Sequence, residues 1–394
     1  MNKIFAATVF VLVYSSIAFS KSWDLNDVSI LMDLPRSGEG DHFLLKPRSS
    51  GMKGELLPDE HSETLRFIVV DVYDNPEHDY EALRVIGMRI DPCFIFSDEK
   101  LEKCSPVLRL IWQPLNFKKN TTYDAAVHAF YGLTKDEFKI LASKLKALKI
   151  KNESFGIYTD SKPLFIHPAL KQSGRRASFN NEIKKIILNF AGNTNLNRIT
   201  IMKMMTRDLW WQFSGLDKNP DGKWSNMAIP RLNVGSFIQD FFNDDFFEKI
   251  GMKGTILPFT KFNDDDLSRI VRGPDISEYD REDLKKAMVT INRIENPRIH
   301  SPSTLDCVHC HITESTRIWA DKVASPMVKE YATAENLYVK GIMSKKHNLN
   351  NITRSKVQNK SIRAFGYFGN LPSINQRTIN ESSQVAEDMN KAGY

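Results

Sequence analysis

The amino-acid sequence predicts a multidomain α+β protein, with a strand-rich N-terminal region that also contains helices and a small all-α domain at the C-terminus. Two observations lead to this prediction. Apolar and polar residues alternate with a period near two in several segments before residue 115, as in half-buried strands. From about residue 278 the period becomes that of amphipathic helices. We therefore expect a signal peptide over 1–20, α+β modules over 21–150 and 151–277, and a helical domain over 278–394.

The first 20 residues have the composition of a secretory signal peptide. Lys3 precedes an apolar run over 4–13, and the small residues Ala18 and Ser20 precede an expected cleavage site before Lys21. No later segment approaches the roughly 20 apolar residues of a membrane helix. We expect a mature chain that is periplasmic or otherwise exported and has no membrane span. An uncleaved N-terminal anchor is the alternative.

The first module is predicted from three alternating segments and one helical segment. The helix has Thr134 as its N-cap and carries apolar residues on one face. The expected strands are 65–74, 82–90 and 107–115, and the expected helix is 134–149.

The second module repeats this pattern, and the segments GMKGELLP (51–58) and GMKGTILP (251–258) are explained either by kinship between the two modules or by a recurring turn with glycines and a proline. The stretch 217–224 imitates the start of a calcium loop, but Ala228 stands where the closing glutamate belongs, so a hairpin turn is preferred. The expected elements are a helix at 180–192 and strands at 196–205 and 209–213.

The C-terminal region is predicted to be helical. Pro297 ends the first helix, and a polar loop over 340–362 precedes the last one. The expected helices are 281–294, 312–324 and 376–392.

Cys93 and Cys104 form one of two cysteine pairs in a chain with four cysteines. In an oxidising compartment a pair this close in sequence is typical of a disulfide. In the chain-entropy model a loop of this size is worth roughly 3 kcal/mol. Two free buried thiols are the alternative.

The other pair belongs to the motif Cys307-Val-His-Cys310-His311. This spacing is typical of covalent haem attachment, in which each thiol adds to a vinyl group and the adjacent imidazole binds the iron. A redox dithiol would require a βαβ setting that the region lacks. A zinc site would require further ligands, and the nearby His300 and His309 lack the usual companions.

Residues 307–311 resemble the attachment site of c-type cytochromes. The resemblance implies one covalent haem c, with Cys307 and Cys310 as thioether anchors and His311 as the proximal iron ligand. It also implies a small cytochrome c-like haem domain at the C-terminus. His309 would be an exposed spacer. The resemblance covers the motif and, loosely, the last hundred residues; the first 280 residues resemble no particular family.

The distal iron ligand is expected from the loop after residue 340, because a helix behind His311 carries the chain away from the haem. Met343 is the leading candidate and His347 the alternative, with Met389 behind them. A five-coordinate iron is also open. Haem propionates have four candidate partners, although for each of them the ordinary role of a surface arginine or a core aromatic is preferred: Arg363, Arg377, Trp319 and Tyr367.

These features predict an exported monohaem electron carrier rather than a catalyst. Its partner would be a redox protein, and the net charge of +6 is compatible with an acidic one. Nucleic acid is not expected, because the chain has no concentrated basic segment. The alternatives are a five-coordinate haem enzyme that acts on peroxide or another small oxidant, and a haem-bearing sensor or binding protein.

Overall fold

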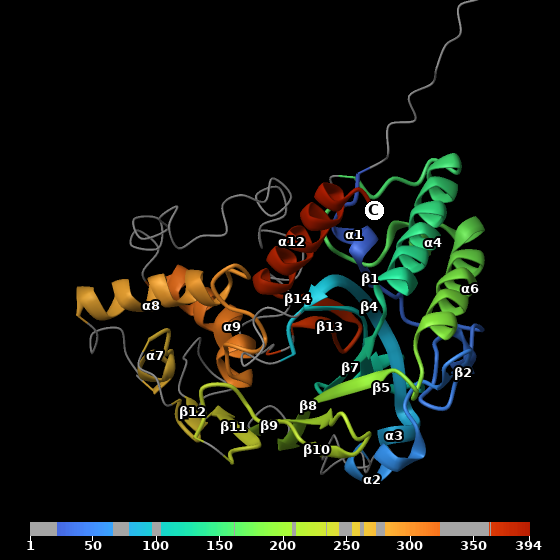
Figure 1. The fold of residues 1–394 in the computed structure, drawn as a ribbon. Helices are drawn as coiled ribbons and strands as arrows, with labels where there is room; N and C mark the ends of the chain where they lie inside the picture. Colours follow the sequence, from blue (N-terminus) through green and yellow to red (C-terminus); the bar gives the residue numbers. More distant parts are fainter. Residues whose placement is uncertain are drawn as a thin grey trace, which may run out of the picture.

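The computed structural model of the chain describes residues 22–65, 79–96, 104–160, 162–206, 210–233, 235–243, 254–260, 264–272, 280–323, 362 and 364–394. The predicted mixed α+β class is confirmed: a large antiparallel sheet lies at the centre and helices lie around it (Figure 1). Within these ranges, no helix combines the length and the apolar character that crossing a membrane requires.

One ten-stranded sheet organises the molecule, in the order β1-β4-β5-β7-β8-β9-β11-β12, with β6 beside β5 and β10 beside β9. The pairing of β7 with β8 carries the sheet across the predicted module boundary at residue 150. The strands are β1 (Ser29–Leu31), β4 (Leu83–Phe94), β5 (Ser105–Asn116), β6 (Thr121–Thr122), β7 (Ala126–Gly132), β8 (Leu196–Thr206), β9 (Trp210–Lys218), β10 (Trp224–Asn226), β11 (Ile238–Asn243) and β12 (Gly254–Leu257).

The strands predicted at 82–90, 107–115, 196–205 and 209–213 are confirmed as β4, β5, β8 and β9. The preferred hairpin turn over 217–224 is also confirmed, because β10 pairs with the end of β9. The strand predicted at 65–74 lies outside the described residues apart from Leu65, which ends the short helix α2 (Ser62–Leu65).

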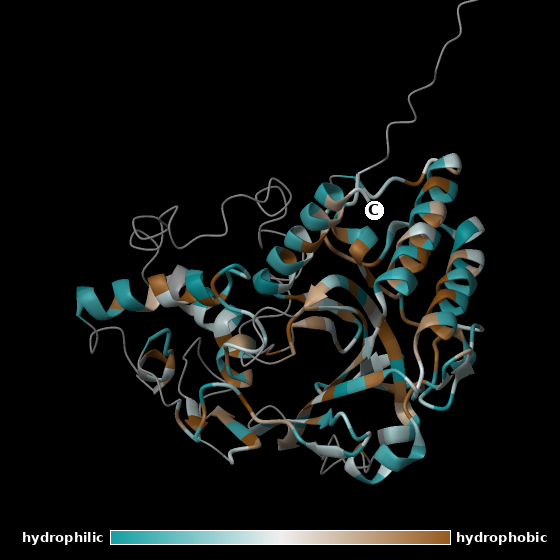
Figure 2. Ribbon diagram, in the orientation of Figure 1, coloured by the Kyte–Doolittle hydropathy of each residue, from teal (hydrophilic) through white to brown (hydrophobic). Residues whose placement is uncertain are grey.

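Helix α4 (Lys135–Ser154) packs on β5, and α6 (Ser173–Phe190) packs on α4. As predicted, Thr134 caps α4: its side chain accepts a hydrogen bond from Glu137 N–H, and the Glu137 carboxylate accepts one from Thr134 N–H. Apolar residues at helical spacing, such as Phe138 and Leu141, are fully buried. Figure 2 shows hydrophobic and hydrophilic residues alternating along both helices, as expected for helices with one buried side.

The C-terminal residues return to the same core. Helices α8 (Arg281–Ile294) and α12 (Gln376–Ala392) have the predicted bounds, and α9 (Cys307–Val323) starts within the cysteine motif. The hairpin of β13 (Phe365–Phe368) and β14 (Leu371–Ile374) was not predicted. It turns at Gly369, whose φ of 60° favours glycine, and β13 packs on β4 and β5.

The short elements connect these parts. The segments GMKGELLP and GMKGTILP differ in structure, since the first forms the hairpin β2–β3 and the second contributes β12 to the large sheet. The remaining elements are α1 (Leu25–Val28), a 3₁₀ turn at Asp41–Phe43, β2 (Ser50–Gly51), β3 (Gly54–Glu55), a 3₁₀ turn at Asp59–His61, α3 (Asp79–Ala82), α5 (Pro168–Lys171) and α7 (Ser268–Arg272).

The predicted disulfide between Cys93 and Cys104 is confirmed. It joins the end of β4 to the residue before β5, and the two Cα atoms are 4.7 Å apart. The bond therefore ties together two neighbouring strands of the central sheet.

Candidate functional site

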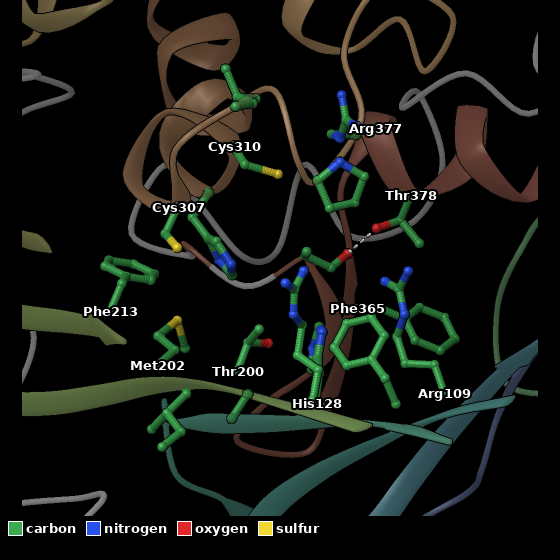
Figure 3. A pocket seen from close by; sticks show the side chains of 18 of the residues that line it. Arg109, His128, Thr200, Met202, Phe213, Cys307, Cys310, Phe365, Arg377 and Thr378 are labelled. Atoms are coloured by element: carbon green, nitrogen blue, oxygen red, sulfur yellow. Dashed lines mark hydrogen bonds between the residues drawn. The ribbon is translucent and has the colours of Figure 1, made fainter. Parts of the chain in front are cut away.

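Helix α9 presents the two free cysteines of the motif on one side. Asp306 precedes the helix, and its Oδ1 accepts a hydrogen bond from the backbone N–H of His309, as an N-cap residue does. Cys307 and Cys310 are three residues apart, about one helical turn, so both side chains point the same way. Figure 3 shows both sulfur atoms directed into one pocket.

This pocket is a cavity, partly open to solvent, between α9 and the central sheet. Strand alternation selects its lining: Ala126, His128 and Phe130 of β7 face the cavity, while Val127 and Ala129 are buried against the other side. Arginine, threonine, methionine and phenylalanine side chains of the neighbouring strands share the cavity face, including Arg89, Arg109, Thr200, Met202 and Phe213.

His311 lines the cavity, with one ring nitrogen already engaged. Its Nδ1 lies 2.6 Å from the backbone oxygen of Ile362, so Nδ1–H is the donor of this hydrogen bond. Burial lowers the pKa of His311, which keeps the imidazole neutral. Nε2 has no hydrogen-bond partner among the described residues, and its lone pair is free. This tautomer is the one expected of a histidine that binds a metal through Nε2.

The two thiols of the motif are free and protonated. Burial raises the pKa of Cys307 well above its usual value and that of Cys310 to about 11. A redox-active dithiol has a lowered pKa, so these thiols do not match that alternative. In the part of the chain that the structure describes, no three His, Cys, Asp or Glu side chains gather as a metal site, so nothing there completes a zinc site around the motif.

The expectation that His309 is an exposed spacer is wrong. Its side chain is 1% exposed. Nδ1 lies 2.8 Å from Asp306 Oδ1, and Nε2 lies 2.8 Å from Asp266 Oδ1. Burial would lower the pKa of His309, but the two carboxylates outweigh it and raise the pKa to about 9. The helix rotates by about 100° per residue, so position 309 points away from the cavity and into the protein.

Arg109 lies on the cavity face, where the charges of Glu381 and Asp91 act on it without direct contact. Its guanidinium lies 4.6 Å from the ring centre of Phe130 and 5.2 Å from that of Phe94. It forms no hydrogen bond or ion pair with another described residue. Burial, with the charge of Arg89 nearby, lowers the pKa of Arg109 to about 10, so the group stays charged. An unpaired arginine in a cavity favours an anionic ligand such as a carboxylate.

Other arginines around the cavity already have partners. Arg198 forms a two-pronged ion pair with Asp217, with distances of 2.5 and 2.8 Å. Arg377 lines the cavity, but it donates to the backbone oxygens of Ile294 and His300 and pairs with Glu381. The Arg377 side chain therefore contributes to the packing between α12 and the segment after α8. Its guanidinium is less available to bind an anionic group in the cavity than that of Arg109.

His128 faces the cavity, although the sequence pattern does not single it out. Burial, then the charges of Arg109 and His311, hold its pKa well below the usual value, so it is neutral. It forms no hydrogen bond with any described residue. The signal available in the sequence was a single polar residue in an otherwise apolar strand, Ala126-Val-His128-Ala-Phe130. Alternation alone does not mark such a residue as functional, because a half-buried strand has one polar face.

The other predicted site residues are distributed as follows. Met343, His347 and Arg363 lie outside the described residues, as does the side chain of Trp319. Met389 is fully buried in α12 and is not part of the cavity lining, and Tyr367 is buried with its hydroxyl donating to the backbone oxygen of Met32.

Glu381 at the cavity edge makes stability depend on pH. It lies 2.9 Å from Arg89 and 2.8 Å from Arg377. Burial would raise its pKa, but Arg377, Arg89 and Arg109 together lower it to about 2 from 4.5. Because the folded pKa is the lower one, the charged carboxylate stabilises the fold above pH 4.5 and this contribution is lost as pH falls towards 2.

We therefore expect Glu381→Gln to lower the thermal midpoint by a few degrees at neutral pH. The difference from the unmodified protein should shrink as pH falls from 4.5 towards 2, measured by circular dichroism. A difference that is constant with pH would contradict this assignment.

The residues present fit a covalently bound haem. Two free thiols one turn apart, an imidazole with a free Nε2, a guanidinium without a direct ion pair to another described residue, and apolar walls line one cavity. No protein-family model, no curated protein and no solved structure matches the chain in comparisons with known proteins.

Proposed function

We propose that the protein is an exported monohaem c-type cytochrome that transfers single electrons. One observation carries the proposal: the thiols of Cys307 and Cys310 and the imidazole of His311 face the same cavity, and Ile362 already holds Nδ1 of that imidazole. The spacing of the motif in the sequence does not by itself determine whether these three groups face the same cavity. When bound, haem would supply a one-electron iron(III)/iron(II) couple.

Covalent attachment of haem to the two thiols would require no oxidant. At each cysteine the S–H bond would break and a C–S bond would form at one carbon of a vinyl group, while the proton would end on the other vinyl carbon. The helical spacing of Cys307 and Cys310 matches two vinyl groups on one edge of a porphyrin. This proposal assigns α8, α9 and α12 to the cytochrome c-like, haem-binding part of the chain.

The surrounding residues would set the properties of the bound group. The Ile362 carbonyl fixes the tautomer and orientation of His311 and raises its basicity as a ligand. Arg109 would pair with a propionate, which removes its unpaired charge. Met202 and Phe213 supply apolar walls, and a low-polarity environment with little water favours the less charged iron(II) state.

The compartment and partner follow from the same proposal. The N-terminal signal sequence would direct export, and the disulfide between Cys93 and Cys104 suits an oxidising compartment. The electron would pass to or from a redox partner protein. With a net charge of +6, an acidic partner would associate faster at low ionic strength.

A second candidate is a haem enzyme that acts on peroxide or another small oxidant. The observation that favours it is the pair of polar groups in the cavity, His128 and Arg109, which have no hydrogen-bond partner among the described residues. Such groups can bind and polarise a small ligand near a metal. A haem-bearing sensor would bind its small ligand at the same open coordination position of the iron.

The experiment that separates the candidates is absorption spectroscopy of the matured protein with and without carbon monoxide, combined with a redox titration. We expect a reversible one-electron titration and a reduced spectrum that carbon monoxide does not change, since both axial positions are filled in a carrier. Ready carbon monoxide binding would contradict the carrier and favour the enzyme or sensor. Protein without haem absorption after expression with haem maturation factors would contradict all three.

A further inference from the structure

The cavity contains two histidines that come from opposite walls. His311 belongs to α9, and His128 projects from β7 on the sheet side (Figure 3). A flat ligand tethered to Cys307 and Cys310 would therefore have His311 on one side and the sheet wall with His128 on the other.

The position of His128 is held rigidly by the sheet. β7 is a central strand, and His128 is directly opposite Ile111 of β5 and Thr200 of β8. Hydrogen-bonded neighbours on both sides leave the strand little freedom to shift or twist. Side chains stand roughly perpendicular to a sheet, so His128 is directed from the sheet towards α9.

His128 also lacks the hydrogen-bond partner that His300, His309 and His167 have. His300 lies 2.8 Å from Asp265, His309 lies between two carboxylates, and His167 accepts a hydrogen bond from Ala169 N–H. His128 forms no hydrogen bond with any described residue, although it faces the cavity. Polar groups in such places are nearly always paired, so the missing partner is expected to be a group that the cavity binds.

From these observations we propose that His128 is the second axial ligand of the haem iron, so that the iron is held between His311 and His128. This inference rests on the proposed haem attachment to α9. It replaces the loop residues Met343 and His347 as the leading distal ligand. Iron held by two histidines has a lower reduction potential than iron held by histidine and methionine.

Met202 and Met227 are the competing ligands within the described part of the cavity, because a thioether sulfur also binds haem iron. They are only 3% and 5% exposed and are packed in hydrophobic clusters. To bind iron, either would have to leave that packing. The half-buried His128 already faces the open space, so it requires no such rearrangement.

The test uses the matured full-length protein and compares His128→Ala, Met202→Leu, Met343→Leu and His347→Gln, with the exposed His42→Ala as a control. Intact mass is measured first, to show that each variant carries haem. Electron paramagnetic resonance of the oxidised protein then reports spin state, and near-infrared magnetic circular dichroism distinguishes two nitrogen ligands from nitrogen and sulfur.

The unmodified protein is expected to be low-spin with two nitrogen ligands. His128→Ala should become high-spin, bind carbon monoxide when reduced, and return to low-spin when imidazole is added. The other four variants should keep the original spectrum. If His128→Ala fails to fold, His128→Met provides a conservative second variant. It should stay low-spin, with one nitrogen and one sulfur ligand on the iron.

Other outcomes overturn the inference in distinguishable ways. A spectrum that is unchanged in His128→Ala but altered in one of the other variants assigns the ligand to that residue. Unmodified protein that carries haem but is high-spin shows that no second histidine binds, while the attachment proposal stands. Unmodified protein without the haem mass contradicts the attachment proposal itself.

Discussion

The double variant Cys307→Ala/Cys310→Ala is expected to lose covalent haem completely. Each thiol is free, and both sulfur atoms point into the cavity, so these cysteines supply both thioether bonds in the proposed site. In a cell that makes haem maturation factors, the unmodified protein should show the mass of the chain plus one haem under denaturing conditions. The double variant should show the mass of the chain alone.

The single variants and a matched control sharpen this experiment. Cys307→Ala and Cys310→Ala should each keep one thioether, so the haem mass should survive denaturation, but the absorption band should shift because one vinyl group stays unsaturated. The control is Cys93→Ser/Cys104→Ser, which removes the disulfide and leaves both cavity thiols intact. It should lose roughly 3 kcal/mol of stability in the chain-entropy model and still carry haem. Haem retained covalently by the Cys307/Cys310 double variant would disprove the assignment.

His309→Leu is expected to destabilise the protein by about 3–5 kcal/mol, because it breaks a buried ion cluster by removing one partner. His309 lies 2.8 Å from both Asp306 and Asp266, and the side chain of Asp306 is completely buried. Without the imidazolium, Asp306 keeps a distant contact with Arg231, 4.0 Å away. Urea unfolding followed by circular dichroism measures the loss.

Two comparisons show whether the buried charge is the cause. Adding Asp306→Asn to His309→Leu removes that charge and keeps a side chain that can cap α9, so the double variant should be more stable than His309→Leu alone. Lys139→Leu removes an exposed ion pair with Asp136 and should change stability by no more than about 1 kcal/mol. A loss below 1 kcal/mol for His309→Leu would contradict the role of the cluster. Covalent haem should remain in all of these variants, since His309 does not line the cavity.

The sequence by itself determined the features that depend on neighbouring residues. The cap at Thr134 and the apolar spacing behind it predicted α4, and the same reasoning gave the bounds of α8 and α12. Alternation predicted β4 and β5. These signals are local, because helix caps, turns and strand alternation involve residues only a few positions apart. The disulfide was predictable for a similar reason, since its cysteines are 11 positions apart.

Tertiary structure decided what faces the cysteine motif. His128 and Arg109 come from strands far before Cys307 in the chain, and sheet register alone brings them to the same cavity. A polar residue in a strand can face water or a buried site, and alternation does not distinguish the two.

The environment of His309 also depends on packing between distant parts of the chain. Its position in the motif suggested exposure, but Asp266, which is 43 positions away in the sequence, lies against its ring. Burial of a residue depends on which distant segments fold over it. Local sequence patterns carry no information about that choice, so the walls of this cavity and the charge of His309 became visible only in the folded chain.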